Sequence, residues 1–184
     1  MKIIVLKFGG TSVGSISRIK KVAKIIKNYS KKYKVIVLSS AMSGTTNKLI
    51  GMSKQISKNF LDDEYDVLVS AGEQISCSLL AGQLSKLKIK SRSWMAWQIP
   101  ILTEGPHKYS RIKYIYKKPI LKFLKEGGIP IISGFQGINK NFKITTIGRG
   151  GTDASAIMIA KFFKADRCVI YTDVEGVYTT DPNK

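Results

Sequence analysis

Lys7-Phe8-Gly9-Gly10-Thr11-Ser12 is the stretch around which this chain is organised. It follows an apolar run at residues 3–6 and precedes an amphipathic segment that begins near Ser15, so a strand, a glycine turn and a helix are expected in that order. Glycine lacks a Cβ, which lets the backbone turn sharply and approach a ligand closely. Free N–H groups at a helix N-terminus attract anions, and Lys7 adds a full positive charge. The stretch predicts a phosphate cradle, with an ordinary turn and a solvated lysine as the alternative.

Short apolar runs alternate with amphipathic segments through the rest of the chain. They predict strands at residues 3–6, 35–38, 88–93, 129–133 and 168–171, and helices over 15–29, 46–56, 71–84, 119–124 and 153–163. Residues 67–69 fit either a strand or a helix, and 94–109 are expected to be an irregular surface excursion. This order predicts the α/β class, as a three-layer αβα sandwich with a mainly parallel central sheet.

The length indicates one domain over residues 1–184, or one domain and a fragment of another, and the 43% of hydrophobic residues suffices for a substantial core. No run of 18 apolar residues occurs, so no membrane-spanning helix is expected. The first expected strand follows directly after Met1-Lys2, which predicts a cytoplasmic protein without a signal peptide. Cys77 and Cys168 lie in apolar contexts and are expected to be buried thiols rather than a disulfide.

The net charge of +19 raises the hypothesis of a nucleic-acid-binding protein. The 31 basic residues are spread along the chain, however, and only five of them are arginine, the side chain that suits base reading and phosphate forks. The composition favours lysine-rich solvated faces, and nucleic acid is not the expected partner. A basic surface would still attract nucleotides and acidic metabolites.

The unusual residues fall just after expected strands. They are Lys7, Ser40, Gly134, the run 148–153 and Asp173. Ligands of parallel α/β sheets bind outside the carboxyl ends of the strands, so these residues are expected to meet at one rim. The chain has neither a Gly-x-x-x-x-Gly-Lys-Ser/Thr loop nor clustered His and Cys residues, which disfavours a P-loop enzyme and a zinc enzyme.

Phosphoryl transfer needs cationic groups and N–H donors around the moving group, a metal ion and a held nucleophile. Lys7 and the first glycine pair supply one such set, and Gly148-Arg149-Gly150-Gly151 supplies a second set with a fork suited to a carboxylate or phosphate. Asp153 is either a partner of the helix dipole or a residue that orients cationic groups or the metal.

Other polar residues have two interpretations each. Glu73, placed in the first turn of its expected helix, is either a dipole partner or a ligand for a substrate amine. Asp173 is either a turn residue or, with Thr172 and Tyr178, part of a nucleotide site. Ser40 and Thr46 are either turn and cap residues or site residues, with Thr45 or Thr46 as the expected cap. His107 is expected to be solvated rather than catalytic, and Trp94 and Trp97 to be packing residues.

Five segments together resemble the amino-acid kinase family, and within it the aspartate kinase group. They are Lys7-Phe8-Gly9-Gly10-Thr11-Ser12-Val13, Ser40-Ala41-Met42-Ser43-Gly44-Thr45-Thr46-Asn47, Ser70-Ala71-Gly72-Glu73-Gln74, Thr146-Ile147-Gly148-Arg149-Gly150-Gly151-Thr152-Asp153, and the run from Tyr171-Thr172-Asp173 through Thr180-Asp181-Pro182. The resemblance implies transfer of the γ-phosphoryl of ATP, carried with Mg²⁺, to the side-chain carboxylate of L-aspartate. The product would be 4-phospho-L-aspartate, on the way to lysine, threonine and methionine. It also implies a homo-oligomer.

The resemblance assigns roles by position. The catalytic residues are Lys7 and Asp153, the ATP-binding residues are Lys7, Phe8, Gly9, Gly10, Thr172, Asp173 and Tyr178, and the aspartate-binding residues are Ser40, Thr46, Glu73, Arg149, Gly150 and Gly151. No residue is assigned as a metal ligand, because Mg²⁺ is expected to bridge the phosphates.

Two departures from the family pattern bear on activity. Ala96-Trp97-Gln98-Ile99-Pro100 stands where the family often has Gly-Trp-Gln-Ala-Gly, and Pro100 restricts that loop. Family members also continue beyond Thr-Thr-Asp-Pro with a further lysine near the phosphates and with regulatory domains. The chain is therefore expected to be a kinase catalytic domain incomplete at its C-terminus and without a regulatory domain. An inactive remnant that binds nucleotide or a partner subunit is the alternative hypothesis.

Overall fold

A parallel sheet forms the centre of the computed structural model, which describes residues 2–148 and 150–172. Its strand order is β3-β6-β2-β1-β9. The strands are β1 (Ile3–Phe8), β2 (Lys34–Ser39), β3 (Ser91–Trp94), β6 (Ile129–Ser133) and β9 (Arg167–Tyr171). Neighbouring strands run parallel at every pairing of this sheet within the described chain. All their carboxyl ends therefore open on the same edge.

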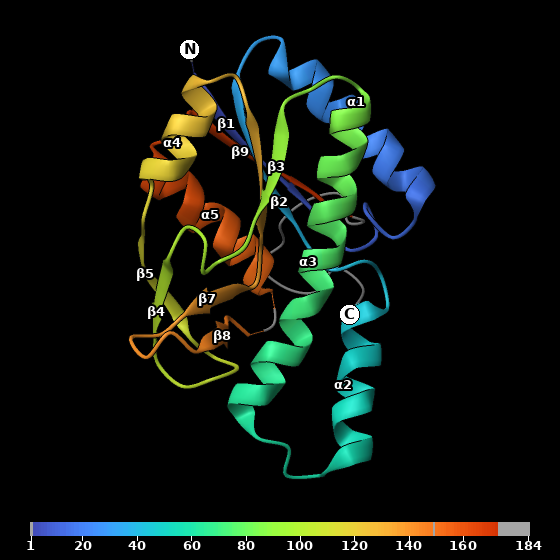
Figure 1. Cartoon of the computed structure of the whole chain (residues 1–184), viewed down its shortest axis with the longest axis vertical. Coiled ribbons are helices and arrows are strands. Elements are labelled where there is room, and N and C mark those ends of the chain that lie inside the picture. The colour runs from blue at the N-terminus through green and yellow to red at the C-terminus, as the bar shows by residue number, and fades with distance from the viewer. Residues whose placement is uncertain (1, 149, 173–184) are drawn as a thin grey trace, which may run out of the picture.

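Helices cover both faces of this sheet (Figure 1). On one face lie α1 (Ile16–Ser30) and α3 (Asp62–Lys86), and α2 (Thr45–Ile56) packs beside α3. On the other face lie α4 (Lys118–Lys125) and α5 (Gly151–Phe163). The predicted αβα sandwich with a mainly parallel sheet is confirmed. Of the residues that the structure describes, none belongs to a helix both long and apolar enough to span a bilayer.

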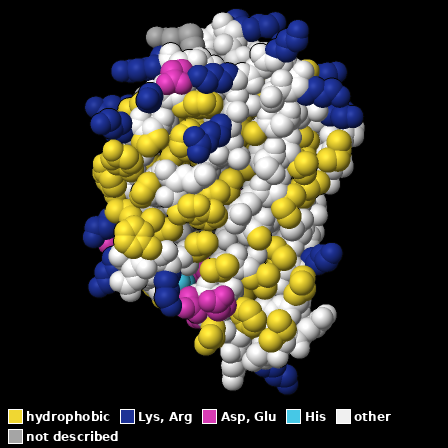
Figure 2. Space-filling view, viewed as in Figure 1, with side chains coloured by type: hydrophobic (Ala, Val, Ile, Leu, Met, Phe, Trp, Pro, Cys, Tyr) yellow, Lys and Arg dark blue, Asp and Glu magenta, His cyan; other side chains and the backbone are white. Residues whose placement is uncertain are grey.

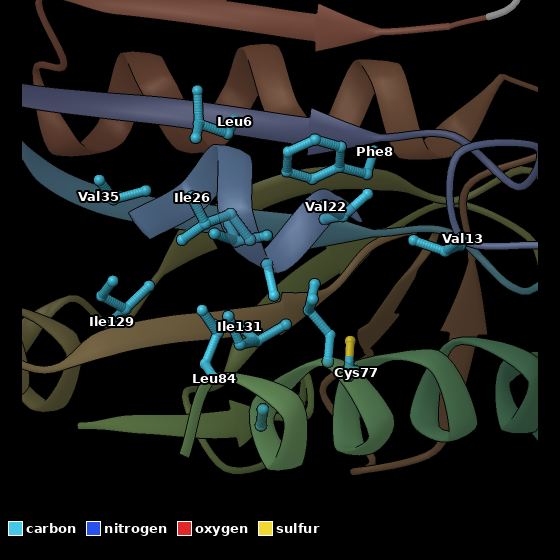
Figure 3. Packing of buried hydrophobic residues seen from close by; sticks show 14 of the residues in the cluster. Leu6, Phe8, Val13, Val22, Ile26, Val35, Cys77, Leu84, Ile129 and Ile131 are labelled. Carbon is cyan, nitrogen blue, oxygen red and sulfur yellow. The ribbon is translucent and has the colours of Figure 1, made fainter. Parts of the chain in front are cut away.

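The alternation of side chains along β1 divides the core between the two faces. Ile4, Leu6 and Phe8 belong to the cluster on the α1 and α3 side, and Figure 3 shows Leu6 and Phe8 in this cluster. Val5 packs on the opposite side against α4 and α5. Lys7 shares that second side, which directs its ammonium group toward α5. Each fully buried aliphatic side chain contributes about 1.5–3 kcal/mol through burial, so the strand is fixed in register.

A second sheet lies below the first in Figure 1, against the N-terminal half of α3. It has the order β5-β4-β7-β8. Its strands are β4 (Ile101–Glu104), β5 (Arg111–Ile115), β7 (Gln136–Ile138) and β8 (Ile144–Thr146). The prediction of an irregular excursion over 94–109 is therefore wrong for β4. These strands have only three to five residues, too few to show a period-2 pattern between turn residues.

The long helix α3 corrects two expectations. Residues 67–69 are helical, and the helix begins at Asp62 rather than near Ala71. Glu73 therefore lies in the middle of α3 and is not a partner for its N-terminal dipole. Three acidic residues in the observed first turn, Asp62, Asp63 and Glu64, interact favourably with the helix dipole instead.

Smaller corrections concern caps and thiols. The N-cap of α2 is Gly44 in the left-handed region, without a side-chain cap, so neither threonine caps the helix. The strand expected at 88–93 is β3, at Ser91–Trp94. Both cysteines are free, but only Cys77 is buried and Cys168 is exposed. Figure 2 shows Lys and Arg side chains distributed around one face with uncharged side chains between them.

Candidate active site

A cleft of about 930 Å³ opens at the carboxyl edge of the parallel sheet. Its lining includes Lys7 from β1, the loop after β2, Glu73 from α3 and the first turn of α5. Of the residues predicted to form the rim, Lys7, Ser40, Gly148 and 150–153 line this cleft, whereas Gly134 is not among its lining residues. A cleft of this volume accommodates a small ligand together with nucleotide phosphates.

Lys7 lies at the base of this cleft with only 6% of its surface exposed. Its Nζ is 2.6 Å from Oδ1 of Asp153, in the first turn of α5. A buried ammonium group requires a partner, and Asp153 provides one while remaining about half exposed. The two residues predicted to be catalytic thus form an ion pair that faces the cleft.

The glycines after β1 are required by close packing. The N–H of Gly9 donates to the carbonyl of Tyr171 at 3.0 Å, and a Cβ on Gly9 would approach Nζ of Lys7 to 3.3 Å. A Cβ on Gly10 would lie 2.9 Å from the carbonyl oxygen of Ala41, inside the normal contact distance. Gly10 therefore lets the β1 loop approach the β2 loop.

Glu73 presents a buried carboxylate to the cleft. Its Oε1 accepts the N–H of Ala41 at 3.1 Å, whereas Oε2 has no hydrogen-bond partner among the described residues. Burial raises the pKa of Glu73 to about 7, although the Ala41 N–H opposes this change. A buried carboxylate with a free oxygen is suited to bind a cationic group of a ligand, because such a group would relieve the desolvation cost.

Ser40 comes from the loop after β2 and Thr46 from the first turn of α2, and both line the cleft. The carbonyl of Ser40 accepts the hydroxyl of Ser76 at 2.6 Å, which fixes this loop to α3. The N–H of Ser40 donates to the carbonyl of Phe8 at 3.1 Å. The loop is thus held to β1 and to α3 beside Glu73.

The glycine-rich loop before α5 supplies the opposite wall. Gly148 and Gly150 both have φ +73°, in the left-handed region that favours glycine, and Gly150 is the N-cap of α5. Gly150 and Gly151 line the cleft, so the positive end of α5 faces it. Arg149, which was predicted to bind the substrate carboxylate, lies outside the described residues.

The predicted nucleotide residues are only partly described. The ring of Phe8 is fully buried and stacks on Tyr171 at 4.7 Å, so any nucleotide contact of Phe8 would involve its backbone. Thr172 follows directly after β9. Asp173 and Tyr178 lie outside the described residues.

The sequence alone did not identify every lining residue. Phe135, Lys108 and Tyr109 also line the cleft, and Phe135 has φ +65°, which is unusual for a residue with a side chain. Its position directly after β6 was the available signal. The expectation that His107 is solvated is wrong, because its Nδ1 is 2.7 Å from Oδ2 of the buried Asp66.

The chain belongs to the amino acid kinase family, since the model of that family matches residues 2–184. Among curated proteins it is similar to the aspartokinase of Rickettsia conorii, with 50% identity over 99% of the chain and 46% of the relative. It is also similar to the aspartate kinase of Pseudomonas putida, with 47% identity over 99% of the chain and 44% of the relative. The chain thus spans about half the length of the curated relatives it matches.

Solved structures show the same likeness. Aspartate kinase from Synechocystis has a TM-score of 0.82 and 42% identity, covering 98% of this chain and 30% of that one. Aspartokinase III of E. coli in complex with aspartate and ADP has a TM-score of 0.88 and 25% identity, covering 99% of this chain and 52% of that one. That relative binds an amino acid and a nucleotide together.

Proposed function

We propose that this chain takes part in ATP-dependent phosphorylation of the side-chain carboxylate of L-aspartate, giving 4-phospho-L-aspartate on the way to lysine, threonine and methionine. The observation that carries this proposal is the pairing of two features in one cleft. These are the buried Glu73 carboxylate, whose Oε2 has no hydrogen-bond partner among the described residues, and the ion pair between the buried Lys7 and Asp153. The first suits the ammonium group of an amino acid, and the second suits a phosphoryl group.

The amino acid would bind between α3 and the start of α5. Its ammonium group would meet Glu73, and Ser40 and Thr46 would line the same pocket. Its α-carboxylate would lie near Gly150 and Gly151 at the N-terminus of α5, where the helix dipole favours negative charge. Arg149 is proposed to pair with that carboxylate on the basis of the family resemblance. This orientation leaves the side-chain carboxylate directed toward Lys7.

The chemical step needs no proton transfer, because the attacking carboxylate is already ionised. One of its oxygens bonds to the γ-phosphorus of ATP, while the bond from that phosphorus to the β–γ bridging oxygen breaks and its electrons leave with ADP. Lys7 stabilises the negative charge on the transferring group. Asp153 holds the Lys7 ammonium in place. Gly9 and Gly10 allow the phosphates to approach the backbone, and Thr172, Asp173 and Tyr178 are proposed to hold the adenosine.

The donor set around Lys7 fits Mg²⁺ that arrives bound to ATP. Within the described residues no three His, Cys, Asp or Glu side chains converge as a metal cage, and Asp153 is the carboxylate that contacts Lys7. Mg²⁺ in kinases needs only one or two carboxylates besides phosphate oxygens and water. When bound, it neutralises charge on the phosphates.

A cytoplasmic homo-oligomer is also proposed. Its support is the family resemblance and the outer face of α3, where Val67, Ile75 and Leu79 are exposed. Exposed apolar surface of this kind is typical of an interface.

The test combines turnover and binding. The chain is incubated with ATP, Mg²⁺ and L-aspartate, and acyl phosphate is trapped with hydroxylamine as the hydroxamate. Titration calorimetry measures aspartate and ADP binding in parallel. Hydroxamate formation that requires aspartate supports the enzyme. Binding of both ligands without turnover favours the inactive remnant, and absence of aspartate binding overturns the proposed substrate.

A further inference from the structure

A second buried carboxylate lies on α3 outside the residues assigned above. Asp66 is fully buried, and its oxygens accept hydrogen bonds from three groups. His107 Nδ1 is 2.7 Å from Oδ2, the backbone N–H of Lys108 lies 3.1 Å from Oδ2 and 3.2 Å from Oδ1, and the Thr146 hydroxyl is 2.5 Å from Oδ1. A buried carboxylate with so many donors fixes the segments that carry them.

Both donor segments form a wall of the cleft. Lys108 and Tyr109, in the loop between β4 and β5, line it together with Thr146 at the end of β8. The N–H of Ser110 donates to the carbonyl of Thr146 at 3.0 Å, which joins the two segments directly. Asp66 is therefore the point where α3, the 105–110 loop and β8 meet.

This wall supports the turn that leads into α5. A Cβ on Gly148 would lie 3.2 Å from the carbonyl oxygen of Lys108 and 3.4 Å from the ring of Tyr109, so the turn rests directly on the loop. The N–H of Gly151 donates to the carbonyl of Gly148 at 3.0 Å, which links the turn to the first residue of α5. The position of the α5 N-terminus therefore depends on the loop that Asp66 holds.

Asp66 and Glu73 are seven residues apart on one helix. Seven residues make nearly two full turns and span about 10 Å, so the two carboxylates lie on the same face of α3. Glu73 presents to the cleft an oxygen without a hydrogen-bond partner among the described residues, and Asp66 fixes the wall formed by the 105–110 loop and β8. The rigid helix thus sets the separation between Glu73 and the α5 N-terminus.

We propose that Asp66 is a positioning residue for amino-acid binding: through the 105–110 loop and Thr146, it sets the distance between Glu73 and the start of α5. This inference rests on the proposed function, because it assumes that these two groups bind the ammonium and carboxylate ends of one α-amino acid. The inference adds Asp66, which contacts neither the ammonium end nor the carboxylate end of the amino acid. A residue with a purely structural role would affect the stability of the fold and both ligands alike.

The test compares L-aspartate and ADP binding by titration calorimetry in the full chain and in Asp66→Asn. Asparagine keeps the volume of aspartate but replaces one carboxylate oxygen, which accepts hydrogen bonds, with an amide group that donates them. The dissociation constant for aspartate is expected to rise about tenfold or more, since small displacements of paired binding groups are costly, while that for ADP stays within about twofold. Asp63→Asn is the matched control, because Asp63 lies on the same helix and contacts Lys143 at the surface, and it is expected to change neither constant.

A second pair of variants keeps the inference testable if Asp66→Asn does not fold. His107 is partly exposed, and His107→Ala removes one donor to Asp66. It is expected to weaken aspartate binding, and His107→Asn, whose amide nitrogen can replace Nδ1, is expected to restore it. Equal losses for aspartate and ADP, or unchanged aspartate binding in folded variants, overturn the inference. If the unaltered chain does not bind aspartate, the proposed function itself fails.

Discussion

Replacing Glu73 with glutamine tests the electrostatic basis of the site. Burial raises the pKa of this carboxyl from its ordinary value of 4.5 to about 7. In the unfolded chain the group ionises near its ordinary value, so between these two pH values the folded state holds a proton that the unfolded state has lost. The folded protein therefore loses stability as the pH rises through this window. The loss reaches about 3 kcal/mol above pH 7, because a pKa difference of one between the folded and unfolded states corresponds to about 1.4 kcal/mol.

Glu73→Gln removes this titration while preserving the volume and the acceptor for the Ala41 N–H. Urea unfolding at pH 5 and pH 8 measures the free energy of unfolding of both proteins. Between these pH values the original chain is expected to lose about 2–3 kcal/mol more than the variant. Because each protein is compared with itself at two pH values, any pH-independent effect of the glutamine amide on the free energy of unfolding cancels. Equal pH dependence in the two proteins would refute the assignment of a raised pKa to Glu73.

Ligand binding provides a second measure of the same property. If an ammonium group meets Glu73, aspartate binding must ionise the carboxyl, which releases about 0.9 proton at pH 6 and about 0.1 proton at pH 8. Calorimetry in buffers with different ionisation enthalpies counts these protons. Glu73→Gln is expected to abolish the release and to weaken aspartate binding. Aspartate binding without proton release at pH 6 would show that the ammonium group lies elsewhere.

Three further outcomes follow from the geometry. Lys7→Met is expected to lower hydroxamate formation by about 100-fold or more, because it removes the cation at the transferring phosphoryl, and Asp153→Asn by a smaller factor; unchanged rates in both variants would contradict their roles. Gly134→Ala is expected to destabilise the fold by about 1–3 kcal/mol in urea unfolding, because its Cβ would lie 2.4 Å from Cγ2 of Thr152, whereas Gly82→Ala, which meets nothing within 4 Å, serves as the helical control. A thiol reagent is expected to label Cys168 in the native protein and to label Cys77 only after unfolding, with mass spectrometry identifying the site; native labelling of Cys77 would contradict its burial.

The parallel sheet and much of the site could be predicted because their signals are local. The inner strands β1, β2 and β6 are buried on both faces and therefore stand out as continuous apolar runs, as in residues 35–38. The carboxyl-edge rule then places Lys7, Ser40 and the glycine-rich loop together without any knowledge of contacts. The Lys7–Asp153 pair needed the family resemblance as well, since these residues are far apart in sequence.

The cluster around Asp66 could not be predicted in this way. In sequence, Asp66 belongs to an acidic run that looks like a solvated helix start, and His107 follows Gly105 and Pro106 in what looks like a surface turn. Asp66 and His107 are 41 residues apart in the sequence, and Asp66 and Thr146 are 80 residues apart. The packing of the second sheet against α3 buries Asp66 completely and leaves His107 partly exposed.

The strand order also determines when the site can be assembled during synthesis. β1 is made first, yet it lies between β2 and β9, and β9 emerges last among the described strands. At about 5–20 residues per second, β1 waits roughly 8–30 seconds for its second neighbour, with one hydrogen-bonding edge unpaired. Gly9 meets Tyr171, and Lys7 meets Asp153, only after that interval. The ribosome thus delivers the Lys7 segment early and its partners late, which makes the nascent chain dependent on protection of an apolar edge strand until almost the whole described chain has emerged.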